Sequence, residues 1–499
     1  MAAVPAELRA RVGAWIARDP EPEARQELRA MLDAGDVAGL GARFSGRLEF
    51  GTAGLRGAMG AGPMRMNRAV VRESAAGIAR HLRSAADAAA GVVVANDARR
   101  HSARFAADCA EVIAAHGIPV VLGGAPLSTP VAVFAIRHLG AAAGIVVTAS
   151  HNPPADNGLK LYMGDGAQIV PPVDAMVAGA IDAVAADGVV VPADGARARV
   201  TPLPDGVVDA YVSRTLARVP PPAAPIRIAT TAMHGVGGAL LARLLDAAGH
   251  ADVHPVAAQQ EPDGGFPTVP FPNPEEPGAT DMLAARMRET GAVLGLALDP
   301  DADRVAVLVD AAGGVRQLTG DETGALLGEW LLAEVTSGPG RLTVTSVVSS
   351  SLLGRIAAAH GAEHRETLTG FKWLSRPAME DPGLTQVLAY EEAIGYAVGP
   401  DVRDKDGLSA ALAVASMASA YAGRGRTLAD ALDDLHRSHG AHVTANFSLR
   451  DESPGGAERR AALVGRLAGD PPAAVGPLAV RAATPLAPDV LRLDLDGGV

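Results

Sequence analysis

The chain has 499 residues, of which 48% are hydrophobic and 3% aromatic, and its formal net charge at pH 7 is −12. A chain of this length is expected to form several domains, and many small apolar residues beside few aromatic ones favour α/β packing. The acidic balance argues against a nucleic-acid partner and against an anionic membrane surface. It is compatible with a phosphorylated small molecule, which needs only a local basic pocket.

Cys109 is the only cysteine, which excludes an intramolecular disulfide and is typical of a reducing compartment. Residues 1–11 carry charges and lack the apolar segment of a secretory signal. No uncharged run approaches the ~20 residues that span a bilayer. We therefore expect a cytoplasmic protein, either a monomer or a homodimer, without nucleic-acid or membrane partners.

Residues 1–45 predict a helical extension. Apolar residues at positions 8, 12, 15 and 16 follow helical spacing, and a second helical pattern over residues 23–33 ends before Gly35. A glycine-rich stretch at residues 50–67 follows and contains Arg56. Dense glycine around an arginine suits a backbone that approaches a ligand closely, although a mobile surface loop has the same composition.

A strand–helix–strand pattern recurs at residues 92–122, 226–256 and 342–368, which predicts three related mixed α/β domains in series. We expect a first domain over residues 46–200, a second over 201–310 and a third over 311–425. Residues 426–499 are expected to form a smaller α+β C-terminal domain.

Ser150 follows a short apolar run at residues 144–147 that predicts a buried strand. Pro153 and Pro154 cannot continue a central strand, so Ser150 is expected in a turn at the strand's carboxyl end, where α/β sheets bind ligands. Lys160 follows a second turn and brings a cation nearby. A turn or helix cap is the alternative explanation, and a hydrolase nucleophile is disfavoured because no Gly-x-Ser-x-Gly elbow surrounds Ser150.

Three carboxylates, Asp299, Asp301 and Asp303, follow a second apolar run at residues 291–298. Like charges at this spacing repel unless a cation neutralises them, and oxygen-only ligands favour Mg²⁺. A solvated acidic turn is one alternative. Another is an aspartyl-phosphate phosphatase with Asp301 as nucleophile, but the strand is expected to end at Asp299, and that hypothesis leaves Ser150 unexplained.

A strand-end serine and a metal loop in different domains together suggest phosphoryl transfer through a phosphoserine. Phosphate monoesters need acceleration of up to about 10²¹-fold, whereas general acid–base catalysis supplies only about 10²–10⁴-fold. Positioning and charge neutralisation by a metal, Arg and Lys must therefore carry most of the catalysis.

These motifs resemble those of the α-D-phosphohexomutase superfamily, which includes phosphoglucomutases, phosphomannomutases and phosphopentomutase-like enzymes. Thr-Ala-Ser-His-Asn-Pro at residues 148–153 is similar to its phosphoserine loop, and Asp-Pro-Asp-Ala-Asp-Arg at 299–304 to its metal loop. Leu-Ala-Tyr-Glu-Glu-Ala-Ile-Gly-Tyr at 388–396 resembles its sugar-recognition loop. The segments at 50–57 and 402–407 look closest to the phosphopentomutase-like and glucose-1,6-bisphosphate synthase branch.

The resemblance implies four domains around a central cleft. Phosphorylated Ser150 would give its phosphoryl group to a sugar monophosphate, and the sugar bisphosphate, as intermediate and activator, would return its other phosphate to Ser150. The resemblance implies that the catalytic residues are Ser150, His151, Lys160 and Arg56. It implies that the substrate-binding residues are Glu391, Lys372, Arg403 and Lys405. The implied ligands of Mg²⁺ are Ser150, Asp299, Asp301 and Asp303. Arg304 could equally pair with a loop carboxylate, and Glu392 could equally lie on the surface.

Two features depart from the family pattern. Ala393 stands where many hexose-specific members carry Ser, so a hydroxyl contact is missing. Alternating leucines at 491, 493 and 495 predict a half-buried strand, and Gly497-Gly498 is a hairpin signal. We therefore expect a C-terminal domain that stops before the family's Arg-x-Ser-Gly-Thr-type phosphate loop.

The leading hypothesis is a Mg²⁺-dependent mutase that moves a phosphoryl group between C1 and C6 of mannose or glucose phosphates. A phosphopentomutase acting on ribose or deoxyribose phosphates is the alternative, favoured by Ala393 and the branch-like segments. A sugar-phosphate-binding protein without turnover is a third hypothesis, favoured by the missing phosphate loop.

Overall fold

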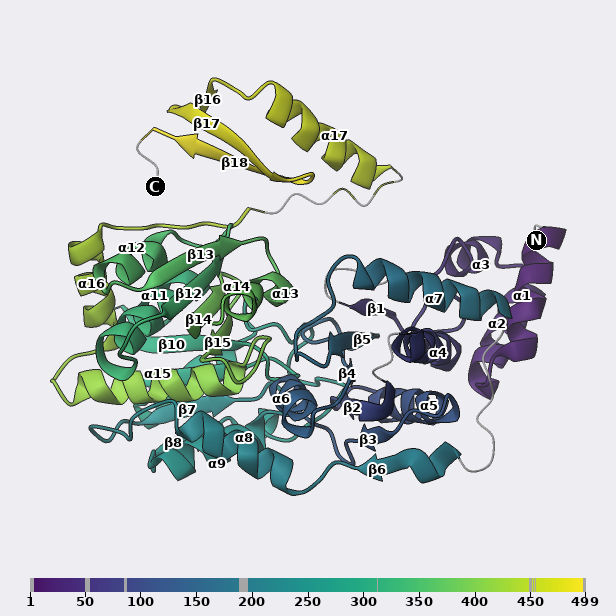
Figure 1. Cartoon of the computed structure of the whole chain (residues 1–499), viewed down its shortest axis with the longest axis horizontal. Coiled ribbons are helices and arrows are strands. Elements are labelled where there is room, and N and C mark those ends of the chain that lie inside the picture. The colour runs from purple at the N-terminus through teal and green to yellow at the C-terminus, as the bar shows by residue number, and fades with distance from the viewer. Residues whose placement is uncertain are drawn as a thin grey trace.

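The computed structural model describes residues 4–49, 54–84, 88–187, 196–311, 313–447, 451, 453 and 455–496. Three α/β domains and a smaller α+β unit follow one another along this part of the chain, as the sequence predicts (Figure 1). The first domain fills one half of the molecule, the second and third pack together in the other half, and the C-terminal unit lies beside the third domain (Figure 1).

The N-terminal extension contains three helices rather than the expected two: α1 (Ala6–Arg18), α2 (Pro22–Ala34) and α3 (Val37–Arg43). Helix α2 ends at Gly35, which adopts the left-handed conformation that glycine favours. Buried side chains of all three helices, including Trp15, join the core on one face of the first sheet.

The first domain is a six-stranded sheet in the order β1-β5-β4-β2-β3-β6. Strands β2, β3, β4 and β6 run parallel, and β5 and β1 are antiparallel to their neighbours. The strands are β1 (Leu55–Ala58), β2 (Val92–Asn96), β3 (Val120–Leu122), β4 (Ala143–Val147), β5 (Asp156–Met163) and β6 (Val200–Pro202). Its helices are α4 (Arg68–Ser84), α5 (Ser102–Ala115), α6 (Thr129–Leu139) and α7 (Val173–Asp187).

The second domain is a five-stranded sheet in the order β11-β10-β9-β7-β8. Its strands are β7 (Ile228–Thr231), β8 (Val253–Pro255), β9 (Leu294–Leu298), β10 (Val305–Ala311) and β11 (Gly314–Gln317). The helices that accompany them are α8 (Gly206–Leu216), α9 (Gly238–Ala248) and α10 (Asp281–Thr290).

The third domain is a four-stranded sheet in the order β13-β12-β14-β15. Its strands are β12 (Arg341–Ser346), β13 (Glu363–Thr367), β14 (Thr385–Glu391) and β15 (Gly395–Val398). Its helices are α11 (Gly320–Trp330), α12 (Leu352–Ala359), α13 (Phe371–Leu374), α14 (Arg376–Glu380), α15 (Gly407–Ala422) and α16 (Leu428–His439).

Strand pairing and helix packing extend the three domains slightly beyond the boundaries that the sequence predicts. Strand β6 pairs with β3 and so extends the first sheet to Pro202, and β11 pairs with β10 and extends the second sheet to Gln317. Helix α16 lies beyond residue 425 yet packs on α11, α12 and α15. Linker composition in the sequence does not report these contacts, because they depend on strand register and buried helix faces.

The three sheets repeat one topology. In each, two parallel strands joined by a helix are followed by a third parallel strand on the other side, and then by an antiparallel return strand. The third strand and its return strand are β4 and β5, β9 and β10, and β14 and β15. Each domain thus places one loop at the carboxyl end of a buried strand, where α/β sheets bind ligands.

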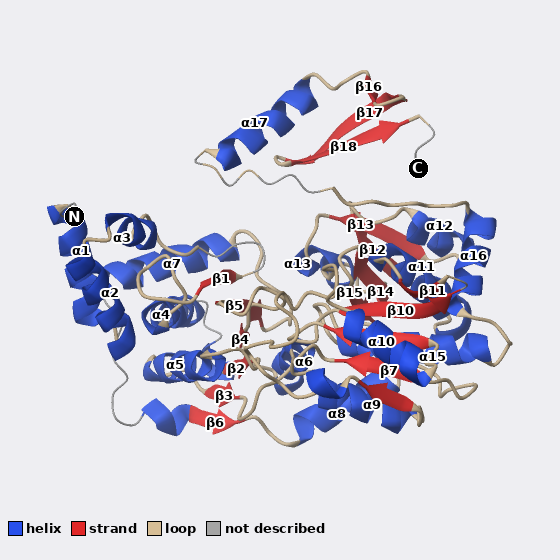
Figure 2. Cartoon of the chain, turned by 180° about the vertical axis from the view of Figure 1, so that it is seen from behind, coloured by secondary structure: helices blue, strands red, loops and turns tan. Residues whose placement is uncertain are grey.

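One hydrophobic core joins the domains. It contains helix α6 of the first domain and buried residues of the second and third sheets, while α4, α5 and α7 pack on the opposite face of the first sheet. Figure 2 shows helices on both sides of the strands of the large sheets. This shared core fixes the three strand-end loops relative to one another.

The C-terminal unit consists of α17 (Gly456–Gly469), β16 (Ala474–Val475), β17 (Leu478–Ala487) and β18 (Val490–Leu495), and its strands are antiparallel. Strand β18 confirms the alternating pattern predicted at its end of the chain. Arg492 pairs with Glu366 of β13 at 3.1 Å. Gly497 and Gly498 lie outside the described residues. Among the described helices, none has the length and apolar character to cross a membrane.

Candidate active site

Ser150 lies in the loop between β4 and β5, in the turn that the sequence predicts. Its backbone φ is 51°, in the left-handed region that L residues avoid, and the residue is 1% exposed. The Ser150 N–H donates to Thr148 Oγ1 at 2.8 Å. The hydroxyl is therefore held inside the molecule by an unusual backbone conformation.

His151 lies within this loop next to Ser150, and Arg56 contacts the loop from β1. His151 Nδ1 lies 3.2 Å from Ser150 Oγ, and burial together with the charges of Arg304 and Arg56 lowers the pKa of His151 to about 2. The imidazole is therefore neutral at pH 7. Arg56, on β1, donates to Asn152 Oδ1 at 3.3 Å. The glycine-rich residues 50–53 that precede Arg56 lie outside the described residues.

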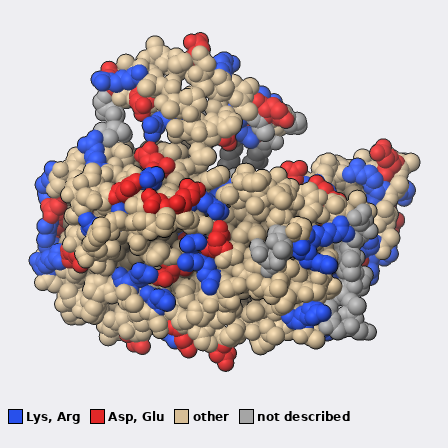
Figure 3. All heavy atoms as spheres, viewed as in Figure 1, with Lys and Arg blue, Asp and Glu red and all other residues tan. Residues whose placement is uncertain are grey.

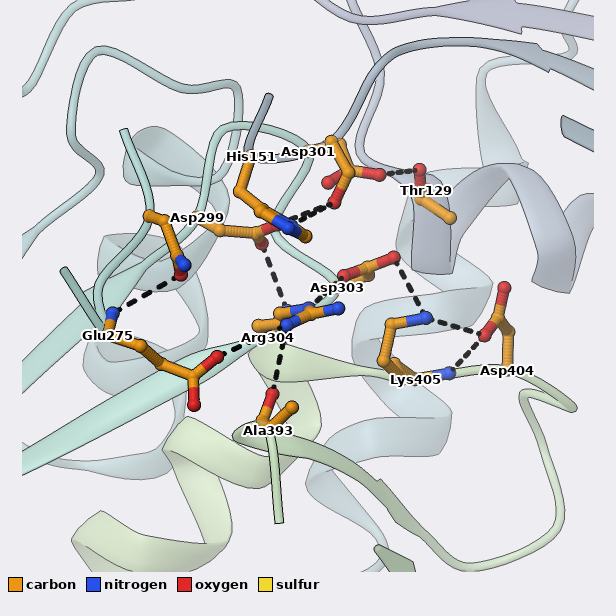
Figure 4. A network of polar contacts seen from close by, with 12 residues as sticks. Thr129, His151, Glu275, Asp299, Asp301, Asp303, Arg304, Ala393, Asp404 and Lys405 are labelled. Atoms are coloured by element: carbon orange, nitrogen blue, oxygen red, sulfur yellow. Dashed lines mark hydrogen bonds and ion pairs between the residues drawn. The ribbon is translucent and has the colours of Figure 1, made fainter. Parts of the chain in front are cut away.

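The three aspartates of the loop between β9 and β10 are completely buried, and one oxygen of each lies within 4.8 Å of the others (Figure 4). Ser150 Oγ donates to Asp299 Oδ2 at 3.0 Å, so the loops of the first and second domains meet. Strand β9 ends at Leu298, which makes Asp299 the first residue after the strand. An aspartyl-phosphate nucleophile at Asp301 does not fit this position.

Cationic side chains from two other domains face the aspartates. Lys160 Nζ lies 2.8 Å from Asp301 Oδ2 and 2.7 Å from Asp303 Oδ2, and Lys405 Nζ lies 3.3 Å from Asp303 Oδ2. Thr129, at the start of α6, donates both its N–H and its hydroxyl to Asp301. The positive end of the α6 dipole adds to this favourable field.

The pKa values of Asp299 and Asp301 shift in opposite directions. Burial and the neighbouring charges of Asp301 and Asp303 raise the pKa of Asp299 well above its usual range. Burial also opposes ionisation of Asp301, but Lys160 and the hydrogen bonds that the carboxylate accepts outweigh it and lower the pKa of Asp301. Burial and two neighbouring negative charges thus oppose ionisation of Asp299, and a bound divalent cation would favour it.

The donor set suits a hard divalent cation. Asp301 Oδ1 and Asp303 Oδ1 are buried and have no hydrogen-bond partner in the described part of the chain. Such unpartnered buried oxygens are costly unless a ligand completes them. Carboxylate oxygens with a nearby serine hydroxyl are the ligands that Mg²⁺ prefers.

Arg304 links the aspartate loop to the third domain (Figure 4). Its Nη1 donates to the Ala393 carbonyl at 3.1 Å and pairs with Glu275 at 3.4 Å, and its Nε lies 3.9 Å from Asp303. The ion pair left open by the sequence is present, and the contact with Ala393 ties the second loop to the third.

Glu391 and Glu392 lie at the end of β14, in the third loop. Glu391 Oε1 accepts the Gly370 N–H at 2.7 Å, and Glu392 Oε2 accepts the Ser346 hydroxyl at 3.2 Å. Glu392 is half-buried and lines a pocket of about 270 Å³ with Glu275 and Asp321. Its position is therefore internal rather than on an open surface.

Lys372 and Arg403 face other neighbours than the aspartate loop. Lys372 Nζ lies 5.6 Å from the Trp373 ring centroid, and Arg403 Nη1 donates to the Asp165 carbonyl at 2.9 Å. Of the four residues expected to bind substrate, Lys405 is the one with a direct contact to the aspartates. Acidic and basic atoms meet on the face where the two halves of the molecule adjoin (Figure 3).

Each of the three loops contains one non-glycine residue with positive φ: Ser150, Ala302 (59°) and Ile394 (52°). Left-handed L residues are strained, and they persist where the surrounding structure over-determines them. Such strain cannot be read from the sequence.

Several residues of the site carry no sequence signal for their position. Thr129 precedes a proline at a helix start, and nothing in that pattern predicts a contact with Asp301 172 positions away. Asp404 is buried and accepts the Tyr162 hydroxyl at 2.5 Å, across the seam between the first and third domains. Arg99 contacts the Ser150 loop through four hydrogen bonds.

The fold and this site define a protein of the phosphoglucomutase/phosphomannomutase type. Family models for alpha/beta/alpha domains I, II and III of phosphoglucomutase/phosphomannomutase match residues 47–187, 209–313 and 319–438. The chain belongs to this family of phosphosugar mutases.

Individual relatives agree with this assignment. A probable phosphomannomutase from Haemophilus influenzae is 43% identical over 393 residues, which cover 78% of this chain and 79% of that protein. A phosphopentomutase from Mus musculus is 35% identical over 86% of this chain and 74% of its own. A crystal structure of a phosphoglucomutase/phosphomannomutase family protein from Burkholderia thailandensis has the same fold, with a TM-score of 0.70, 24% identity and coverage of 89% and 88%.

Proposed function

We propose that the protein moves a phosphoryl group between C1 and C6 of a hexose phosphate, with mannose and glucose as first candidates. Ser150 is the phosphoryl carrier and a sugar bisphosphate is the intermediate. The observation that supports this most directly is the 3.0 Å contact between Ser150 Oγ and Asp299 Oδ2. It joins the hydroxyl of a serine with a strained backbone to a cluster of carboxylates that favours a divalent cation.

Asp299, Asp301, Asp303 and an oxygen on Ser150 would hold Mg²⁺. The bound ion would neutralise charge on the phosphoryl group during transfer. The unpartnered oxygens of Asp301 and Asp303 support these residues as ligands. Lys160 bridges the same two carboxylates and would offset part of their charge.

In the transfer from phosphorylated Ser150, a sugar hydroxyl oxygen forms the new bond to phosphorus while the bond to Ser150 Oγ breaks. The hydroxyl loses its proton, and Ser150 Oγ gains one. His151 Nδ1 lies 3.2 Å from Oγ, within hydrogen-bond reach of the atom that gains the proton, and this distance supports a role for His151 in the proton transfer. Arg56 and Lys160 supply positive charge near the transferring group.

The third domain would recognise the sugar phosphate. Glu391 lies at the end of β14, where the third loop begins, and its carboxylate accepts the Gly370 N–H. It is suited to accept hydrogen bonds from sugar hydroxyls as well. Lys405 would reach the phosphate beside Asp303, while Lys372 and Arg403 would bind farther along the same domain. The cytoplasm is the expected compartment.

A phosphopentomutase is the second candidate function. Ala393 offers Arg304 only its backbone carbonyl and has no side-chain hydroxyl for a hexose. The 35% identity to a phosphopentomutase also supports this alternative. A sugar-phosphate-binding protein without turnover remains the competing hypothesis of another class.

Phosphorus NMR of the purified protein would test these functions. The protein, with Mg²⁺ and a trace of sugar bisphosphate, is offered mannose, glucose and ribose 1-phosphates separately, and Ser150→Ala is the control. Conversion of a hexose phosphate that the variant lacks supports the proposal. Conversion of the ribose phosphate alone selects the phosphopentomutase. Conversion of none by folded protein overturns both and favours the binding protein.

A further inference from the structure

Arg99 lies between β2 and α5, and its side chain reaches into the Ser150 loop. Nη2 donates to the Ser150 carbonyl at 2.6 Å and to the Asn152 carbonyl. Nη1 donates to the Pro153 carbonyl at 2.9 Å and to the Asp156 carbonyl at 3.2 Å. One buried guanidinium thus holds four backbone oxygens of the loop that carries the nucleophile.

Arg99 is itself fixed from both sides. The carboxylate of Asp97 accepts the Arg99 N–H at 2.9 Å, and its other oxygen lies 3.5 Å from Arg99 Nε. The guanidinium carbon of Arg99 lies 5.0 Å from the ring centroid of Phe266 in the second domain. At Gly264, an added Cβ would lie 2.8 Å from Arg99 Cα, so the second domain touches the Arg99 backbone as well.

Arg99 adds to the hydrogen bonds that the Ser150 loop makes within itself, such as those from the Ser150 N–H to Thr148 Oγ1 and from the Asn152 N–H to the Ala149 carbonyl. Ser150 adopts φ of 51°, and Pro153 and Pro154 have no N–H to donate. Four converging carbonyls need several N–H donors in one plane, and among side chains the arginine fork meets that need. Arg99 is 3% exposed, so the protein largely shields these hydrogen bonds from water.

We propose that Arg99 is a positioning residue for phosphoryl transfer at Ser150. It holds the loop in the strained conformation that points Oγ at Asp299, and through Phe266 it ties that orientation to the second domain. Its terminal N–H groups are all engaged by the loop, so Arg99 acts through the loop and touches no substrate. This inference rests on the proposed role of Ser150 as phosphoryl carrier.

The proposal predicts a loss of kcat with little change of KM. Misplacement of a reacting group by about 1 Å costs on the order of 10²-fold in rate. We expect Arg99→Lys and Arg99→Met to lower kcat about 10²-fold, with KM changed less than threefold. Lysine should not rescue, because a single ammonium cannot bind four carbonyls in this geometry.

Arg68 offers a matched control. It is also a buried arginine of the first domain, 9% exposed, and it binds Asp108 at 2.7 and 3.0 Å. Its hydrogen-bond partners in the described part of the chain, Asp108 and Glu21, lie outside the Ser150 loop. Arg68→Met should lower thermal stability but leave kcat per folded molecule unchanged. Should Arg99→Met not fold, Arg99→Lys and Phe266→Leu carry the test, and Phe266→Leu is expected to lower kcat by a smaller factor.

The experiment measures kcat, KM and rapid-quench transfer from radiolabelled phosphoserine, together with hydrogen exchange of residues 148–157, in the full-length protein. In Arg99→Lys we expect slower transfer and exchange at least tenfold faster in that segment. Wild-type kcat in a folded Arg99 variant, or a loss no larger than in Arg68→Met, overturns the proposal. If the wild-type protein shows no turnover, the proposed function fails instead, and unchanged exchange in Arg99→Lys would separately overturn the positioning role.

Discussion

The Ser150 loop and the aspartate loop occupy the same place in two related sheets, but they are held by opposite means. The first follows β4, and Arg99 holds its backbone through hydrogen bonds to neutral carbonyls. The second follows β9, and ammonium groups of Lys160 and Lys405 face its carboxylates. The shared topology therefore places both loops at the carboxyl end of a buried strand. The residues of each loop and their neighbours determine whether it fixes a backbone shape or concentrates charge.

The difference has a functional consequence. A nucleophile must be positioned precisely, so hydrogen bonds fix the shape of its loop. A metal loop must instead concentrate negative charge, and neighbouring cations must offset that charge when no ion is bound. Backbone strain is common to all three loops, because Ala302 of the aspartate loop and Ile394 of the third loop also have positive φ. What distinguishes the aspartate loop is its concentration of buried carboxylates. Changes of charge should therefore affect the aspartate loop most.

The largest effect is expected for Asp303→Asn. Asp303 Oδ2 lies 2.7 Å from Lys160 Nζ and 3.3 Å from Lys405 Nζ, and Oδ1 has no hydrogen-bond partner among the described residues. Removal of its charge should weaken metal binding and lower kcat about 10³-fold, as the loss of a single preorganised electrostatic contact can. Steady-state kinetics over a Mg²⁺ series checks this.

The matched control for that variant is Asp433→Asn on α16. The Asp433 side chain is 67% exposed, and among the described residues its ion-pair partner is Arg437 of the same helix. It should leave both kcat and the Mg²⁺ requirement unchanged. A kcat of Asp303→Asn within threefold of the wild-type value would remove the aspartate loop from the catalytic machinery.

Much of this site can be predicted from the sequence. The strand–helix–strand repeat, the turn at Ser150 and the end of the strand before Asp299 are local features, encoded by apolar runs and prolines. The contacts between domains are not local. Thr129 and Lys160 reach Asp301 from the first domain because a shared core aligns the sheets, and no spacing within one segment records that alignment.

The strained positions escaped prediction for a related reason. Ala302 and Ile394 are residue types that disfavour positive φ, so the sequence argues against the conformation that they adopt. Three helices in place of two in the extension reflect packing as well, because α3 is a short helix that buries Leu40. Tertiary contacts override local preference at these places.

The next effect is on stability. Lys160→Met removes the ammonium between Asp301 and Asp303, and breaking a buried ion pair by removing one partner costs about 3–5 kcal/mol. Urea denaturation in the absence of divalent cations should detect this loss. The double variant Lys160→Met/Asp303→Asn should lose less than the sum of the two single changes, because they share a contact. Strict additivity would mean that the two groups do not interact.

Asp406 shows what a buried carboxylate does when no ammonium bridges it. Burial raises its pKa from 3.8 to about 6, although the Ser409 N–H and the Tyr211 hydroxyl donate to it. The folded state then binds the proton more tightly than the unfolded state. The contribution of this carboxyl to stability should therefore be greatest below about pH 4 and fall by about 3 kcal/mol as pH rises through 6.

Asp406→Asn should flatten this part of the pH dependence of unfolding. Asn keeps an acceptor for the start of α15, and at pH 7 the variant should be up to about 3 kcal/mol more stable than the wild type. Denaturation midpoints between pH 4 and 7 measure it. A variant with the wild-type slope would show that another group titrates in this window.

The smallest effect tests whether charge alone holds the aspartate loop. Gly235 packs directly behind it: an added Cβ would lie 2.5 Å from Pro300 Cα, and the Val236 N–H donates to the Pro300 carbonyl at 2.9 Å. Gly235→Ala should cost about 1–3 kcal/mol by overpacking and raise the Mg²⁺ concentration needed for half-maximal activity. Gly179→Ala on α7, where an added Cβ meets nothing within 4 Å, is the control and should stabilise by up to about 1 kcal/mol. If Gly235→Ala destabilises the fold while the Mg²⁺ requirement stays unchanged, the carboxylates are placed by Lys160 and Lys405 and not by the backbone beneath them.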